Sequence, residues 1–131
     1  MYIDQSREQM PHTTALIVEA EAIVALDLQN TLQRFGYEVS CFTCSGKDAL
    51  QKSQETCPEF IVMDVSLQGE MDGIEVARQI RKMSNIPIVY LASYMDEKRL
   101  EHAKPTAPFS FVIKPFEETE LHSAIERVFN E

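Results

Sequence analysis

Residues 60–64 read Phe-Ile-Val-Met-Asp, four consecutive apolar residues that end in an acid. Such a continuous apolar run is typical of a strand that is buried on both faces, as in a parallel sheet covered by helices. On either side of this run, further apolar runs occur at residues 15–18, 37–42, 86–91 and 109–113. The sequence therefore predicts five strands, and Asp64 lies at the carboxyl end of the third.

Helical patterns separate these runs. One helical face is predicted from apolar residues spaced four, four and three apart: Val24, Leu28, Leu32 and Phe35. Gly36 follows them and is a typical helix stop. The chain thus turns back after its first predicted helix and enters the second predicted strand.

Capping residues and apolar spacing predict the other four helices. They are expected from 47 to about 53, after Asp72, from 96 to 103 and from 117 to 130. Ser45 and Asp48 form a capping arrangement for the first of these, and Asp72 can cap the second. The residues expected to face inward in the second and the last are Val76, Ile80, Met83, Leu121, Ile125 and Val128.

The order of elements is therefore a strand followed by a helix, five times. This alternation predicts an α/β fold with a doubly wound, parallel five-stranded sheet. Five strands favour the flavodoxin-like (βα)5 order 2-1-3-4-5. A chain of 131 residues is expected to form one domain, here residues 14–131, after a polar and flexible tail at residues 1–13.

The composition is typical of a soluble globular protein, with 44% hydrophobic and 25% charged residues. A formal net charge of −9 disfavours direct nucleic-acid binding, which needs a basic face. No apolar run approaches the roughly 20 residues of a membrane-spanning helix, and the N-terminus lacks the pattern of a signal peptide. The odd cysteine count of three, together with the lack of a secretory signal, favours a reducing, cytoplasmic location. Because no apolar run is long enough to span a membrane, no membrane association is expected.

Chemically active side chains are expected at one edge of the sheet. In chain order they follow or end successive strands: Glu19, Glu21, Asp64, Ser93 and Lys114. Ligands of such sheets bind beyond the carboxyl ends of the strands, where the strand order switches. This set suits phosphoryl capture, in which Asp64 forms an acyl phosphate, Lys114 and Mg²⁺ neutralise charge, and Ser93 donates a hydrogen bond. Each residue alone is more often a cap or a surface residue, but together they favour a site.

Six stretches of this chain occur in the order and spacing of a known family. They are LIVEAE at 16–21, GYEV at 36–39, SGKDAL at 45–50, IVMDVSLQGEMDGIEVARQIR at 61–81, IPIVYLASY at 86–94 and FVIKPF at 111–116. In these stretches the chain resembles the receiver domain of two-component response regulators. The resemblance covers nearly the whole chain, from about residue 14 to residue 131.

The resemblance implies a role for each residue of the expected site. Asp64 would be the phosphorylated aspartate, and Lys114 would be the lysine whose bond to Pro115 is typically cis. Glu19 would be the first of two acids at the Mg²⁺ site. Ser66 would give its backbone carbonyl to the metal.

The resemblance also implies a switch and partners. Phe111 would be the aromatic residue that rotates inward on activation, together with a switch position at Ala92 or Ser93. The phosphoryl donor would be a histidine kinase or a phosphotransfer protein. A partner or output domain would bind the face made by the fourth helix, fifth strand and fifth helix. Such a domain is a signalling domain and not an enzyme, although it assists its own phosphorylation and dephosphorylation.

One departure from the family concerns the metal site. Similar sequences usually read VEDE where this chain reads VEAE, so Ala20 replaces the acid that is normally a direct Mg²⁺ ligand. Mg²⁺ binding is expected to be weakened because this acid is lost, but not abolished because Glu19 and Asp64 remain. Glu21 is a poor replacement, since alternate residues of an extended chain point the same way and place it on the side of Glu19.

A second departure concerns the hydroxyl that binds the phosphoryl group. The family usually reads LTA, whereas this chain reads Leu91, Ala92, Ser93. Counting back from Lys114 puts Ala92 at the hydroxyl position. Ser93 replaces the missing hydroxyl only if the loop shifts by one residue.

A Cys-x-x-Cys spacing joins Cys41 and Cys44. Redox and zinc sites use this spacing, but Cys41 falls in a predicted strand, where residues three apart face opposite sides. The three histidines show no ligand spacing. Ordinary strand and loop cysteines are therefore the preferred interpretation.

Three functions remain open on the sequence. The first is a receiver that takes a phosphoryl group on Asp64. The second is a pseudo-receiver, which acts as a protein-interaction module without phosphorylation, as Ala20 and Ala92 suggest. The third is a flavodoxin-like cofactor binder, but the chain has no Gly-rich phosphate loop and places two acids after the first strand. The cognate kinase, the stimulus and the oligomeric state cannot be read from the sequence.

Overall fold

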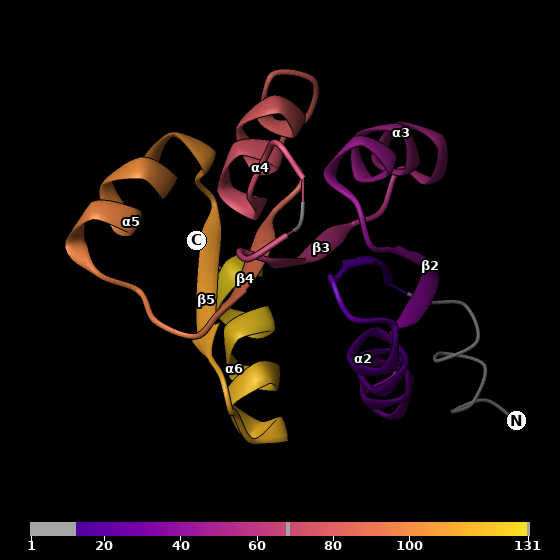
Figure 1. The fold of residues 1–131 in the computed structure, drawn as a ribbon. Helices are drawn as coiled ribbons and strands as arrows, with labels where there is room; N and C mark the ends of the chain where they lie inside the picture. Colours follow the sequence, from indigo (N-terminus) through magenta and orange to yellow (C-terminus); the bar gives the residue numbers. More distant parts are fainter. Residues whose placement is uncertain (1–12, 68, 131) are drawn as a thin grey trace, which may run out of the picture.

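The computed structural model describes residues 13–67 and 69–130. Strands and helices alternate along the chain, as predicted (Figure 1). The strands are β1 (Thr14–Val18), β2 (Glu38–Thr43), β3 (Phe60–Asp64), β4 (Ile88–Ala92) and β5 (Phe109–Ile113). The helices are α2 (Ala22–Arg34), α3 (Gly46–Thr56), α4 (Gly73–Arg81), α5 (Glu97–Ala103) and α6 (Glu118–Phe129), and the short 3-10 helix η1 (Lys104–Thr106) follows α5.

The five strands form one parallel sheet in the order β2-β1-β3-β4-β5, which confirms the predicted flavodoxin-like topology. Figure 1 shows α2 and α6 on one face of this sheet and α3, α4 and α5 on the other. The strand order switches between β1 and β3, so the carboxyl ends of these two strands flank the expected ligand site.

The central strand β3 explains how the two faces are filled. Its side chains alternate between faces, so Ile61 and Met63 join the core under α3, α4 and α5, while Phe60 and Val62 join the core under α2 and α6. All four are fully buried. Each such side chain contributes about 1.5–3 kcal/mol relative to exposure, which is why this run is apolar on both faces.

Side-chain caps fix where the helices begin. The Ser45 hydroxyl accepts from the Asp48 backbone N–H at 3.1 Å, and the Asp72 carboxylate accepts from the Glu75 N–H at 2.9 Å. Both caps were predicted. At α6, the backbone N–H of Glu117 donates to Oε1 of Glu120 at 2.8 Å. Each such contact satisfies a backbone group that a helix end would otherwise leave unpaired.

Some predicted boundaries and orientations were wrong. Met83 was expected to face inward from the third helix, but α4 ends at Arg81 and the Met83 side chain is 49% exposed. β4 begins at Ile88 instead of residue 86, because Pro87 has no backbone N–H to donate to the sheet. α3 continues to Thr56, three residues beyond the predicted end.

The predicted flexible tail lies outside the described residues, except for Thr13. The Thr13 carbonyl accepts from the backbone N–H of Glu38 at 2.9 Å, so this residue is already fixed to the start of β2. Within the described part of the chain, no helix is long and apolar enough to cross a membrane.

Candidate phosphoacceptor site

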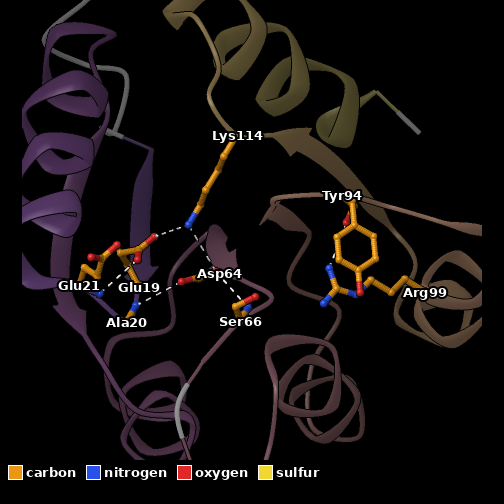
Figure 2. A network of polar contacts seen from close by, with 8 residues as sticks. All are labelled: Glu19, Ala20, Glu21, Asp64, Ser66, Tyr94, Arg99 and Lys114. Carbon is orange, nitrogen blue, oxygen red and sulfur yellow. Dashed lines mark hydrogen bonds and ion pairs between the residues drawn. The ribbon is translucent and has the colours of Figure 1, made fainter.

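Three strand ends bring together two acids and a lysine at the carboxyl edge of the sheet. Glu19 follows β1, Asp64 ends β3 and Lys114 follows β5. The Lys114 ammonium nitrogen lies 3.5 Å from Oε1 of Glu19 and 3.6 Å from Oδ1 of Asp64 (Figure 2). The predicted convergence of these three side chains therefore exists in the structure.

Backbone donors from two loops hold the Asp64 carboxylate. The Ser66 N–H donates to Oδ1 at 3.0 Å, and the Ala20 N–H points to Oδ2 at 3.4 Å (Figure 2). The Asp64 side chain is nearly fully buried. Hydrogen bonds to a carboxylate are charge-assisted, so these donors and the Lys114 ammonium together stabilise the negative charge at this position.

Glu19 is the more deeply buried acid of the pair, with no exposed surface. Burial raises the pKa of Glu19, and the neighbouring Asp64 adds to the increase, while the Glu21 N–H and the Lys114 ammonium oppose it. The Glu21 N–H donates to Oε2 of Glu19 at 3.1 Å. One oxygen of the Glu19 carboxylate thus faces the backbone of the segment that follows it.

Glu21 contributes its backbone N–H to the site, as the donor to Oε2 of Glu19. Its side chain is exposed, and it is the N-cap residue of α2, in extended conformation. Ala20 lies between the two acids and offers a methyl group where an acid was expected from the family. Among residues 13–67 and 69–130, no group of three or more His, Cys, Asp or Glu side chains is arranged to hold a metal ion.

Ala92 is the last residue of β4, and Ser93 follows it. The Ala92 carbonyl accepts from the backbone N–H of Lys114 at 2.8 Å, and the two strands pair Ala92 with Ile113. Ala92 is buried and Ser93 is exposed. In the described part of the structure, no hydrogen bond joins the Ser93 hydroxyl to Asp64.

Phe111 lies in the middle of β5, where it pairs with Tyr90 of β4. Its side chain is half-buried and packs against the core under α3, α4 and α5. Phe111 therefore rests against the same core as Met63, which precedes Asp64 in β3.

Gly73, the first residue of α4, is a site residue to which the sequence reasoning assigned no role. A Cβ atom at this position would lie 2.1 Å from the backbone oxygen of Asp64. The Gly73 N–H also donates to the Val65 carbonyl at 2.9 Å. Only glycine allows the helix to begin this close to the main chain of Asp64.

The loop after β4 is fixed by a contact that the sequence did not indicate. The Arg99 guanidinium lies 4.0 Å from the centre of the Tyr94 ring, and its Nη1 donates to the Tyr94 carbonyl at 3.0 Å (Figure 2). Tyr94 itself is half exposed. This contact ties α5 to the segment that follows Ala92 and Ser93.

The cysteines take no part in the site. Cys41 is half-buried in β2, whereas Cys44 and Cys57 are exposed, and all three are free thiols. Burial raises the pKa of the Cys41 thiol, which disfavours the reactive thiolate.

A family model described as the response regulator receiver domain matches residues 15–126. The chain belongs to the response regulator receiver family. Its fold, its strand order and the acid–lysine convergence are those expected of a receiver domain of two-component signal transduction.

Similar proteins support this assignment. The transcriptional regulatory protein PdtaR of Mycobacterium tuberculosis is 32% identical over 111 residues, which cover 85% of this chain and 54% of PdtaR. The chemotaxis protein CheY of Thermotoga maritima is 27% identical over 86% of this chain and 94% of its own length. The receiver domain of a modulated diguanylate cyclase from Desulfovibrio desulfuricans has a TM-score of 0.82 at 29% identity, covering 92% of this chain and 95% of that one.

The receiver domain spans about half the length of PdtaR and nearly all of CheY. Receivers thus occur both in longer regulators and alone. Membership of this family also favours a receiver over the flavodoxin-like cofactor binder that the fold alone allows.

Proposed function

We propose that this receiver domain, residues 14–131, accepts a phosphoryl group on Asp64 from a histidine kinase or a phosphotransfer protein. The observation that carries the proposal is the position of the Lys114 ammonium, 3.6 Å from Oδ1 of the buried Asp64 carboxylate. A lysine in this position balances the charge of a carboxylate and of an incoming phosphoryl group.

In the transfer, an oxygen of the Asp64 carboxylate forms a bond to phosphorus. The bond between phosphorus and the donor's imidazole nitrogen breaks, and its electron pair remains on that nitrogen. Because the transferred group carries its charge on peripheral oxygens, rate enhancement comes from placement and charge neutralisation. Lys114 and the backbone N–H of Ser66 provide these at Asp64. The domain thus assists its own phosphorylation and later hydrolysis, and acts as a signalling domain.

Asp64, Glu19 and the Ser66 carbonyl are the groups that would hold Mg²⁺. Carboxylate and carbonyl oxygens are the ligands that Mg²⁺ prefers, and the ion would neutralise phosphoryl oxygens. Ala20 removes one acid from this set. Two unit charges about 4 Å apart interact by roughly 4 kcal/mol at an effective dielectric near 20, so a divalent ion loses attraction of that order, partly regained from water. We therefore propose a weakened Mg²⁺ site, to which the exposed Glu21 side chain adds little.

Output is proposed to pass through Phe111 and the surface formed by α5, β5 and α6. Phe111 is half-buried, so it has room to change its exposure. The Ala92 side chain has no hydroxyl to donate to a phosphoryl group, and the exposed Ser93 side chain would have to move to do so. A partner protein or an output domain would read this surface.

A pseudo-receiver is the second candidate, and the methyl groups of Ala20 and Ala92 favour it. The receiver and the pseudo-receiver are distinguished by incubating the protein with Mg²⁺ and acetyl phosphate and measuring its intact mass. Addition of one phosphoryl group to the wild type, absent in Asp64→Asn, supports the first proposal. An inert wild type that becomes reactive as Ala20→Asp establishes the pseudo-receiver and locates its defect.

A further inference from the structure

A basic hollow lies at the carboxyl end of α4, away from the phosphoacceptor site. Arg78, Arg81, Lys82 and Pro105 line it, and its volume is about 220 Å³. We call it the basic pocket. Arg81, the last residue of α4, lies eight positions after Gly73, a distance of roughly 12 Å at 1.5 Å per residue.

Arg81 is held rigidly at this pocket by neutral partners. Its Nε and Nη2 donate to the Thr106 carbonyl at 3.1 and 2.7 Å, and its Nη1 donates to the Ser84 carbonyl at 3.1 Å. Carbonyl oxygens satisfy the donors but carry no net charge. The Arg81 guanidinium is therefore fixed in position, and among the described residues no acid forms an ion pair with it.

Arg78 and Lys82 add two more positive charges. Within the described residues, neither makes an ion pair or a side-chain hydrogen bond, whereas nearby Lys104 is paired with Glu101. The C-terminus of α4 favours cations through its helix dipole, but that effect is typically 0.3–1 kcal/mol and leaves the charges available. The pocket thus concentrates three of the 12 lysines and arginines of a chain whose net charge is −9.

The charge and size of the pocket select its occupant. Its volume is below the roughly 300–1,000 Å³ of small-molecule sites, so it fits one or two side chains better than a whole ligand. Nucleic acids and extended acidic surfaces would be repelled by the negative remainder of this chain. Arginine pairs with carboxylates through two parallel hydrogen bonds. We propose that the basic pocket docks one or two acidic side chains from a short segment of a protein partner.

Occupation of the pocket would be transmitted to the neighbouring elements. Arg81 holds the Thr106 carbonyl of η1, and the Thr106 hydroxyl is hydrogen-bonded to the buried Tyr90 hydroxyl at 2.7 Å. The hydrogen bonds of Arg81 to the Thr106 and Ser84 carbonyls use three of the five N–H groups of the guanidinium, so an acid that binds the other two contacts the same side chain that anchors η1 behind α5. This docking is separate from the phosphorylation of Asp64 and does not require it.

The test is a nuclear magnetic resonance titration of isotopically labelled protein with a short glycine–glutamate repeat peptide, compared with a glycine–glutamine peptide of equal length. We expect the glutamate peptide alone to shift the amide signals of Arg78, Lys82 and Thr106. The double variant Arg78→Ala/Lys82→Ala should bind it about tenfold more weakly, the loss expected for a charge-assisted contact. Arg81 is left unchanged because it supports the fold.

The matched control is Lys47→Ala/Lys98→Ala, which removes the same charge from two exposed residues elsewhere. Its affinity for the peptide should change less than twofold. Equal weakening in both double variants, or shifts that are absent from the pocket, would overturn the proposal. Tighter binding of inorganic phosphate or of single-stranded DNA at these amides would reassign the pocket to another anion. Unchanged amide signals elsewhere verify that each variant is folded.

Discussion

The ammonium nitrogen of Lys114 lies within 3.6 Å of the Asp64 carboxylate, although their strands, β5 and β3, are separated by β4. The backbone N–H of Lys114 donates to the carbonyl of Ala92, the last residue of β4, while its side-chain ammonium nitrogen reaches Asp64 of β3. The same nitrogen lies 3.5 Å from Glu19. One cation therefore serves two buried acids, and it is the natural first target for mutation.

Replacement of Lys114 by alanine should slow phosphorylation by acetyl phosphate roughly 100-fold, the usual cost of losing one preorganised group that stabilises developing charge. The initial rate of phosphoprotein formation, followed by intact mass, measures this. Lys98→Ala is the control, since this exposed residue lies on α5 and should react at the wild-type rate. If Lys114→Ala reacts as fast as the wild type, the role given to this ammonium is wrong.

Ala20→Asp should restore Mg²⁺ affinity, because it returns an acid beside Asp64. The expected gain is about tenfold or more, given the attraction between opposite charges at contact distance. Calorimetric titration with MgCl₂ provides the measurement. Ala22→Asp adds the same charge at the exposed first residue of α2 and should leave the affinity nearly unchanged. An equal gain in both variants would show that long-range charge alone is responsible.

Gly73→Ala should destabilise the domain by roughly 1–3 kcal/mol, because the new Cβ would overlap the Asp64 backbone oxygen unless the chain shifts. Urea unfolding measures the loss, and the phosphorylation rate should fall with it. Gly69→Ala is the comparison: its positive φ of 108° is unfavourable for alanine, by about 1–2 kcal/mol, but its Cβ meets no atom. Loss of phosphorylation is therefore expected for Gly73→Ala and not for Gly69→Ala.

The buried hydroxyl of Tyr90 should make stability fall at alkaline pH. Burial raises the pKa of Tyr90 from 10.0 to about 12, so the folded protein keeps a proton that the unfolded chain loses. The associated stability is fully present below pH 10.0 and is lost as the pH rises toward about 12. Tyr90→Phe should flatten this part of the stability curve, and should cost about 1 kcal/mol at neutral pH through the lost hydrogen bond to Thr106. Tyr94→Phe, at an exposed position, should retain the slope.

The strand order and the main site residues could be predicted because they depend on short patterns. Apolar runs such as residues 60–63 are determined by burial on both faces, and in a parallel sheet the residue after each run reaches the same edge. That reasoning was enough to bring Asp64 and Lys114 together. The departures at Ala20 and Ala92 were identified from the resemblance to the family, whose usual residues differ at these two positions.

The contacts that escaped prediction depend on how distant segments meet. Nothing near Gly73 in sequence shows that its Cα lies against the Asp64 backbone. The contact of Arg99 with Tyr94 depends on the path of the loop after β4, and Arg81 finds its carbonyl partners in two separate turns. Met83 was misplaced for a related reason: its spacing continues the helical pattern, but the backbone N–H groups of Met83 and Ser84 both bond to the Ile80 carbonyl as the helix ends.

The two ends of α4 are attached to different neighbours. Gly73 packs against the backbone of Asp64, and the Arg81 guanidinium donates hydrogen bonds to the Thr106 carbonyl of η1. Because α4 is a single helix of nine residues, it connects these two attachments directly. We therefore expect that a displacement of the Asp64 backbone would also displace the segment behind α5, by a route that uses neither a hydroxyl at position 92 nor a rotation of Phe111.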